Sequence, residues 1–153
     1  MTLPFRTATD HIQAGMQIHA SCAARDGHGV LLLGPSGSGK SDLVLRLLDH
    51  GFVLVADDRV ELEDGVARPA ASLAGLLEVR GLGVVRLPHA DSATVRLAVR
   101  LGAGPRLPDP ARHEDTGAPL VTLDPAAASA PVRVRLALDC VLGRVAQVVG
   151  AFR

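Results

Sequence analysis

One short stretch of the sequence carries the residue types that bind phosphate groups. Residues 34–41 read GPSGSGKS and match the pattern G-x-x-x-x-G-K-[ST] at every fixed position. Glycines let successive backbone N–H groups curl around phosphate oxygens, and a following helix adds the positive end of its dipole. In such a loop the Lys40 ammonium can reach the β- and γ-phosphates, and the Ser41 hydroxyl can ligate Mg²⁺. The pattern predicts a nucleotide-binding P-loop made of Gly34, Pro35, Ser36, Gly37, Ser38, Gly39, Lys40 and Ser41.

The position of the lysine supports this interpretation. Lys40 is the single lysine of a chain that contains 15 arginines. A GC-rich genome would explain why lysine is scarce, but it would not explain why the one lysine occupies the P-loop position.

Carboxylates that could complete such a site follow the next apolar run of the chain. Asp57 and Asp58 come directly after residues 52–56, where a Walker-B aspartate would lie at the end of a buried strand. Adjacent side chains of a strand alternate in direction, so we expect one aspartate to serve a metal or base role and the other to hold structure. A solvated turn or a helix N-cap is the alternative.

Two further polar residues lie in apolar segments. Glu78 stands in the glycine-containing stretch 77–83, where a metal role competes with an ion pair to Arg80 or an edge-strand position. His19 lies on the apolar segment 16–24, and a lone histidine there is more often a core or half-exposed residue than a catalyst.

Short apolar elements must position these groups. Residues 30–33 predict a strand buried on both faces, and residues 41–50 have helical spacing that ends at Gly51, a typical C-cap glycine. Residues 52–56 predict a second buried strand, so the P-loop has a strand before it and a helix after it.

The remaining segments predict a mixture of strands, turns and one closing helix. The Asp-Gly pair at 64–65 predicts a hairpin between 60–62 and 66–68. Gly81 and Gly83 suggest tight or closely approached backbone within 76–87. The other expected elements are strands at 16–24, 94–101, 120–123 and 132–138, a turn at 27–29, an exposed loop at 102–119, a linker at 126–130 and a helix at 139–152.

Composition excludes several classes of protein. With 153 residues the chain suits one domain, and 16 basic residues balance 16 acidic ones, so no net charge attracts nucleic acid or an anionic membrane. No apolar run reaches the length of a membrane span, and the polar N-terminus does not resemble a secretory signal. Cys22 and Cys140 lie far apart and have no CxxC partner, which suits a reducing cytoplasm.

Four blocks of the sequence together resemble one family. They are QIHA around His19, the P-loop at 34–41, LVADDRVEL at 54–62 and LEVRGLGVV at 77–85. The chain resembles the catalytic domain of the HPr kinase/phosphorylase family over about residues 15–100 and more loosely beyond, and the last block is much more specific than a P-loop. The resemblance implies a P-loop α/β domain of the phosphoenolpyruvate-carboxykinase-like kind with a mixed β-sheet, spanning residues 1–153 as one catalytic domain.

The resemblance also implies an activity and residue roles. It implies transfer of the ATP γ-phosphate, with Mg²⁺, to a serine of the phosphocarrier protein HPr, within the regulation of a phosphotransferase system. The reverse reaction of the family uses inorganic phosphate and releases pyrophosphate. Carried onto this sequence, Lys40 contacts phosphates, Asp58 is the base for the serine proton, and His19 is the active-site histidine. Ser41 and Glu78 serve Mg²⁺, and we add Asp57 as a metal residue from its Walker-B position.

The chain departs from the family pattern in three places. The catalytic motifs begin almost at once, which resembles the short, single-domain form of alphaproteobacteria, so we expect no separate N-terminal domain. The catalytic arginine of the family corresponds best to Arg106, with Arg112 as the second choice. Residues 131–136, PVRVRL, lack the Pro-Gly and Asn that the family ties to dephosphorylation, so the kinase reaction is better supported than the phosphorylase reaction.

Two other functions stay open at this point. One is a P-loop kinase for a different acceptor, and the other is a non-catalytic ATP-binding regulatory protein. The family further implies a cytoplasmic homo-oligomer.

Overall fold

A mixed β-sheet forms the centre of the molecule. The computed structural model describes residues 15–153. The prediction that the N-terminus is not a secretory signal concerns residues outside this range. The strands run in the order β1-β5-β6-β9-β3-β2-β4, and β10 pairs with β9 in parallel. Their bounds are β1 Met16–Ile18, β2 Ala20–Arg25, β3 His28–Leu33, β4 Val53–Ala56, β5 Val60–Glu63, β6 Val66–Pro69, β9 Ala93–Leu101 and β10 Leu120–Leu123.

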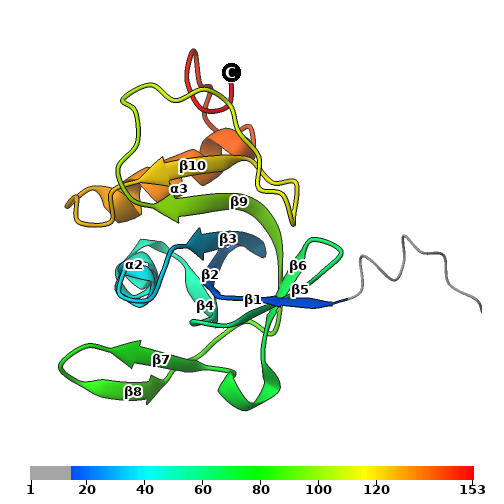
Figure 1. Cartoon of the computed structure of the whole chain (residues 1–153), viewed down its shortest axis with the longest axis vertical. Coiled ribbons are helices and arrows are strands. Elements are labelled where there is room, and N and C mark those ends of the chain that lie inside the picture. Colours follow the sequence, from blue (N-terminus) through cyan, green and yellow to red (C-terminus); the bar gives the residue numbers. More distant parts are fainter. Residues whose placement is uncertain (1–14) are drawn as a thin grey trace, which may run out of the picture.

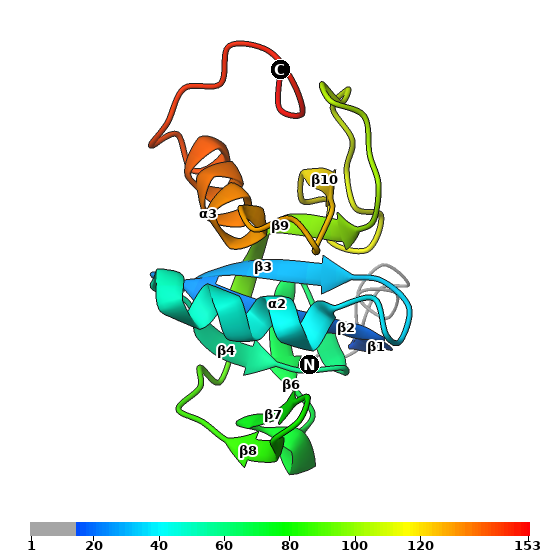
Figure 2. The same ribbon diagram turned by 90° about the vertical axis from the view of Figure 1, so that its left-hand side faces the viewer.

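The helices and a small hairpin surround this sheet. Helix α2 (Lys40–Leu47) lies across β3, β2 and β4, while α3 (Ala130–Val141) and β10 occupy one end of the molecule (Figure 1; Figure 2). The hairpin of β7 (Leu76–Val79) and β8 (Gly83–Arg86) stands at the opposite end as a separate two-stranded sheet. Short 3-10 helices, η1 (Leu48–His50) and η2 (Ala71–Leu73), complete the elements.

The expected fold class is confirmed, since parallel and antiparallel pairs occur in the same sheet. Strand β3 pairs with β9 in parallel and with β2 in antiparallel orientation. Its residues from Gly29 to Leu32 are buried, which agrees with the apolar run that predicted a strand covered on both faces.

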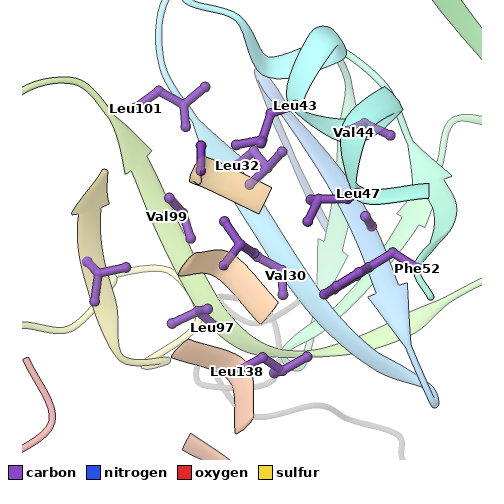
Figure 3. Packing of buried hydrophobic residues seen from close by; sticks show 14 of the residues in the cluster. Val30, Leu32, Leu43, Val44, Leu47, Phe52, Leu97, Val99, Leu101 and Leu138 are labelled. Atoms are coloured by element: carbon purple, nitrogen blue, oxygen red, sulfur yellow. The ribbon is translucent and has the colours of Figure 1, made fainter. Parts of the chain in front are cut away.

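The main core lies between the sheet and the two helices. Leu43, Val44 and Leu47 of α2 recur at helical spacing and are fully buried. They pack with residues of β3 and β9 and with Leu138 of α3, so both helices cover the same face (Figure 3). Burial of this apolar surface fixes α2, and therefore the P-loop, against β3.

A second core covers the opposite face. It contains small and branched side chains of β2, β3, β4 and β9. Strands β5 and β6 contact β2 and β4 respectively, so the β5–β6 hairpin closes over this face. Asp64 and Gly65 both have positive φ, 52° and 77°, as the expected hairpin turn requires.

The glycine-containing stretch 76–87 forms the β7–β8 hairpin. Gly81 and Gly83 have φ of 83° and 125°, so the expectation of tight backbone is confirmed. Within residues 15–153, a Cβ at either position would meet nothing within 4 Å, so no described segment approaches these glycines closely.

The C-terminal third corrects two predictions. Residues 132–138 are not a strand but part of α3, although their alternating apolar and basic side chains are typical of a strand. Packing decides the outcome, because Ala130, Val134 and Leu138 recur every four residues and are all fully buried. Pro131 at the start of the helix is also compatible with its first turn.

The expected closing helix at 139–152 is also wrong. Helix α3 ends at Val141, and Gly143 follows with φ of 77°, the left-handed conformation that commonly ends a helix. The chain beyond it continues in turns.

Smaller differences concern element boundaries. The expected strand 16–24 is divided into β1 and β2 by a bend at His19. The turn expected at 27–29 lies at Asp26 and Gly27, while His28 already belongs to β3. The loop over 102–119 contains no strand or helix, as expected.

Candidate active site

The P-loop connects the end of β3 to the start of α2. Gly37 and Gly39 have φ of 81° and 103°, a region that side chains rarely adopt. A Cβ on Gly34 would lie 2.5 Å from the Ser38 hydroxyl, so the loop has no room for a side chain there. Gly39 is the N-cap of α2 and offers no side-chain cap, which leaves N–H groups of the first turn free to bind an anion.

Lys40 lies inside this loop. Its side chain is buried, and Nζ donates hydrogen bonds to the carbonyl oxygens of Gly34 at 2.6 Å and Pro35 at 3.0 Å. Burial lowers the pKa of Lys40 from its ordinary value, while the negative charges of Asp58 and Asp57 oppose that shift. The result is a cation held at the loop with carboxylates close enough to influence it.

Strand direction explains why the two aspartates reach the P-loop. Strands β3 and β4 are both antiparallel to β2, so they run parallel to each other with β2 between them. The carboxyl end of β4, followed by Asp57, therefore lies at the same edge as the P-loop. The beginning of β2, next to His19, lies at this edge as well.

The Asp57 carboxylate accepts hydrogen bonds from three neighbouring residues. The Ser41 hydroxyl donates to Oδ1 at 2.7 Å, with Oδ2 at 3.0 Å, and the Ser21 hydroxyl donates to Oδ1 at 2.9 Å. The backbone N–H of Glu78 donates to Oδ2 at 3.4 Å. These contacts fix the carboxylate against the first turn of α2.

Asp58 points to a different partner. Its Oδ1 lies 3.3 Å from Nδ1 of His19, and its backbone has a φ of 67°, in the left-handed region. The two aspartates thus face different groups, as expected, but the reason differs: both lie beyond the end of β4, and the left-handed backbone of Asp58 turns its side chain away from that of Asp57.

His19 links Asp58 to the P-loop. Its Nε2 lies 3.4 Å from Nζ of Lys40 and 3.4 Å from the hydroxyl of Ser36. Because an ammonium only donates hydrogen bonds, Nε2 accepts and the ring proton stands on Nδ1, facing Asp58. A line of contacts therefore runs from Lys40 through His19 to Asp58.

The structure brings together most of the residues singled out in the sequence, and leaves two arginines elsewhere. Glu78 lies beside the site through its backbone contact to Asp57, and its side chain is exposed. Arg106 lines a cavity of about 780 Å³ between the 103–108 loop, α3 and the C-terminal turns. Arg112 donates to the carbonyl of Gly117. Within residues 15–153 no hydrogen bond or ion pair joins either arginine to the P-loop, His19 or the two aspartates. A catalytic role therefore stays a prediction for both arginines.

Ser21 is a site residue that the sequence reasoning missed. It is fully buried, and it contacts Asp57 through its hydroxyl and Asp58 through the backbone N–H of that residue. The available signal was a hydroxyl inside the otherwise apolar stretch ASCAA, two residues after His19.

The donor set fits a magnesium ion. Mg²⁺ prefers oxygen ligands, keeps several waters and binds through one or two carboxylates plus substrate phosphates. Ser41 uses its proton on Asp57, which leaves its lone pairs available to a cation. The Ser38 hydroxyl in the same loop is buried and has no hydrogen-bond partner among the residues that the structure describes. Among the described residues no cluster of three or more His, Cys, Asp or Glu side chains forms a self-contained metal site.

A mixed sheet with a P-loop and carboxylates at one edge defines a P-loop α/β protein of the nucleotide-binding class. The chain matches the family model "HPr Serine kinase C-terminal domain" over residues 10–93, more than half of its length. The protein therefore belongs to the HPr serine kinase C-terminal domain family.

Curated relatives match a shorter central part of the chain. The HPr kinase/phosphorylase of Clostridium novyi is 46% identical over 66 residues, which are 40% of this chain and 22% of that protein. The HPr kinase/phosphorylase of Clostridium acetobutylicum is 36% identical over 83 residues, 52% of this chain and 27% of that protein. The chain thus aligns with only about a quarter of the length of these relatives.

A solved structure supports the fold. The Hpr(Ser) kinase/phosphatase from Coxiella burnetii superposes with a TM-score of 0.71 at 23% identity, covering 84% of this chain and 92% of that one. This agrees with the expected carboxykinase-like P-loop fold with a mixed sheet. Within the described part of the chain, no helix is both long and apolar enough to cross a membrane.

Proposed function

We propose that this protein is an ATP- and Mg²⁺-dependent serine kinase whose acceptor is an HPr-type phosphocarrier protein of a phosphotransferase system. The observation that carries the proposal is the line of contacts from Lys40 through His19 to Asp58, which sets a phosphate-binding cation and a carboxylate base on either side of one histidine. Membership of the HPr serine kinase family supports the choice of acceptor.

The P-loop residues bind and orient the nucleotide. The N–H groups at the start of α2 and the Lys40 ammonium neutralise phosphate oxygens once Nζ leaves the Gly34 and Pro35 carbonyls. Ser41, Asp57 and Glu78 would hold Mg²⁺, which when bound neutralises charge on the transferred phosphoryl group. In this arrangement Asp57 also directs the Ser41 hydroxyl by accepting its proton.

Asp58 receives the proton of the acceptor serine. Its side chain is 68% exposed, so an incoming hydroxyl can reach it from solvent. The serine oxygen bonds to the γ-phosphorus, the bond to the ADP oxygen breaks, and the serine proton passes to the Asp58 carboxylate. His19 orients that carboxylate through Nδ1–H while its other nitrogen faces Lys40.

The proposal extends to the setting of the reaction. We place it in the cytoplasm, which the two free cysteines support, and in a single catalytic domain. Exposed apolar side chains at Leu136, Val148 and Val149 support a homo-oligomer. Reversal by inorganic phosphate, with release of pyrophosphate, uses the same residues in the opposite direction, Asp58 returning the proton.

Intact-mass measurement of the carrier tests the proposal. The carrier is incubated with this protein, ATP and Mg²⁺, and Lys40→Ala serves as the control. Gain of one phosphate with wild type alone supports the kinase; a second incubation with inorganic phosphate and no ATP tests reversal. Nucleotide binding without any gain on the carrier would refute this acceptor and favour another acceptor or a non-catalytic regulatory protein.

A further inference from the structure

Ser21 is a buried hydroxyl at the edge of the sheet where the two aspartates meet. It lies on β2 between Ala20 and Cys22, and its side chain has no exposed surface. Burying a hydroxyl is unfavourable unless its hydrogen-bonding groups are satisfied. The Ser21 hydroxyl is satisfied both as a donor, to Asp57, and as an acceptor, from Asp58.

Each contact of Ser21 fixes a different aspartate. The hydroxyl proton goes to Oδ1 of Asp57 at 2.9 Å, and the hydroxyl oxygen accepts the backbone N–H of Asp58 at 3.1 Å. The first contact holds the Asp57 carboxylate in the orientation that also accepts the Ser41 proton. The second contact holds Asp58 at a φ of 67°, a conformation that an L residue adopts only with local support.

We propose that Ser21 is a positioning residue that sets the Asp57 and Asp58 carboxylates in their two separate directions, the first toward Ser41 and the second toward His19. Ser21 touches neither nucleotide nor acceptor in this role and acts through the aspartates. The inference rests on the proposed function for its effect on transfer, but its effect on Mg²⁺-dependent nucleotide binding stands apart from any acceptor.

Removal of the hydroxyl has a specific expected effect. In Ser21→Ala, Asp57 loses one donor and can rotate away from Ser41, so the oxygen set for Mg²⁺ is no longer preorganised. We expect the factor by which Mg²⁺ strengthens ATP binding to fall about ten- to hundredfold, the range for losing a hydrogen bond to a charged group. Affinity for ATP without Mg²⁺, which depends on the loop and Lys40, should change less than threefold, well below the effect of one such hydrogen bond.

The chain offers a matched control on the same strand. Cys22 is also fully buried but belongs to the core on the opposite face of the sheet, and its thiol donates to the Ala23 carbonyl. Among the described residues it makes no hydrogen bond to Asp57 or Asp58. Cys22→Ala removes one heavy atom from β2, as Ser21→Ala does, without touching either aspartate. Ser21→Thr keeps the hydroxyl and tests rescue.

The experiment measures ATP affinity by calorimetry with and without Mg²⁺ for wild type and all three variants, after thermal unfolding has established that each is folded. The proposal expects a reduced Mg²⁺ effect in Ser21→Ala, a wild-type effect in Cys22→Ala and recovery in Ser21→Thr. If Ser21→Thr does not fold, the proposal is tested by comparing Ser21→Ala with Cys22→Ala. The quantity compared is the ratio of ATP affinity with Mg²⁺ to ATP affinity without Mg²⁺.

An unchanged Mg²⁺ effect in Ser21→Ala would overturn the proposal. Equal loss of both affinities in Ser21→Ala and Cys22→Ala would also overturn it, because that pattern indicates a packing role alone. If wild type binds MgATP yet phosphorylates no carrier, the proposed acceptor fails, while the affinity ratios still decide the role of Ser21.

Discussion

Replacement of Asp58 by asparagine separates catalysis from binding. Asparagine has nearly the same shape as aspartate and tolerates the left-handed backbone that Asp58 adopts at φ of 67°. The backbone N–H of residue 58 can still donate to the Ser21 hydroxyl, so the turn after β4 is retained. The variant therefore removes the basic carboxylate and leaves the surrounding structure in place.

The magnitude follows from the exposure of the pair. The Asp58 side chain is 68% exposed and that of His19 is 46% exposed, so water weakens their interaction at 3.3 Å. Even a fully charged pair at this exposure contributes only about 0–1 kcal/mol, so we expect loss of the contact to change ATP affinity by no more than about fivefold. Loss of a general base lowers a rate about 10²–10⁴-fold, equivalent to roughly 3–5.5 kcal/mol of barrier.

The assay compares two quantities on one preparation of Asp58→Asn. Calorimetry measures ATP affinity, and the rate of phosphate gain by the carrier measures transfer under saturating ATP. We expect near-wild-type affinity and at least a hundredfold slower transfer. Wild-type transfer in this variant would show that another group takes the serine proton, and loss of both quantities together would show that Asp58 acts in binding.

Two further predictions address the electrostatics and the fold. Because Lys40 is the single lysine, reductive methylation gives one Nζ-methyl NMR signal, apart from that of the α-amino group. We expect this signal to report a pKa below the ordinary 10.5 in the free protein, because the side chain is buried. In Asp58→Asn we expect the pKa to fall further, because the variant removes a negative charge that raises it. A titration at or above 10.5 would contradict the burial argument. Leu138 is fully buried in α3, so Leu138→Ala should lower the free energy of unfolding by about 2–5 kcal/mol in urea titrations. Exposed Val132→Ala on the same helix is the control, and equal small effects would mean that α3 contributes little to the core.

Local signals explain which parts of the fold could be predicted. The P-loop, its flanking strand and helix, and the Asp64-Gly65 hairpin depend on short-range features: glycines at positive φ and apolar side chains at regular spacing. The helix over 132–138 could not be predicted in this way. Its alternating side chains favour a strand, and only packing of Val134 and Leu138 against β3 and β9 selects the helix.

The sequence allows most residues of the site to be predicted, but not how they lie relative to one another. Lys40, Asp57 and Asp58 carry the motif chemistry in the sequence itself. Their proximity depends on β2 lying between β3 and β4, a pairing that joins distant segments and has no local signature. That same pairing brings Ser21 and His19 to the edge. Ser21 therefore has no local signal in the sequence beyond a hydroxyl in an apolar stretch, and only the family resemblance distinguishes His19 from a core histidine.

Locating the transferred phosphate tests the central claim most directly. After reaction with ATP and Mg²⁺, tandem mass spectrometry identifies the modified residue of the carrier, and acid treatment distinguishes acid-stable phosphoserine from acid-labile phosphohistidine. A carboxylate base facing an exposed hydroxyl predicts an acid-stable phosphate on one serine, formed by wild type and absent with Lys40→Ala. A phosphate on histidine, or a carrier that gains none while this protein binds MgATP, would contradict the account.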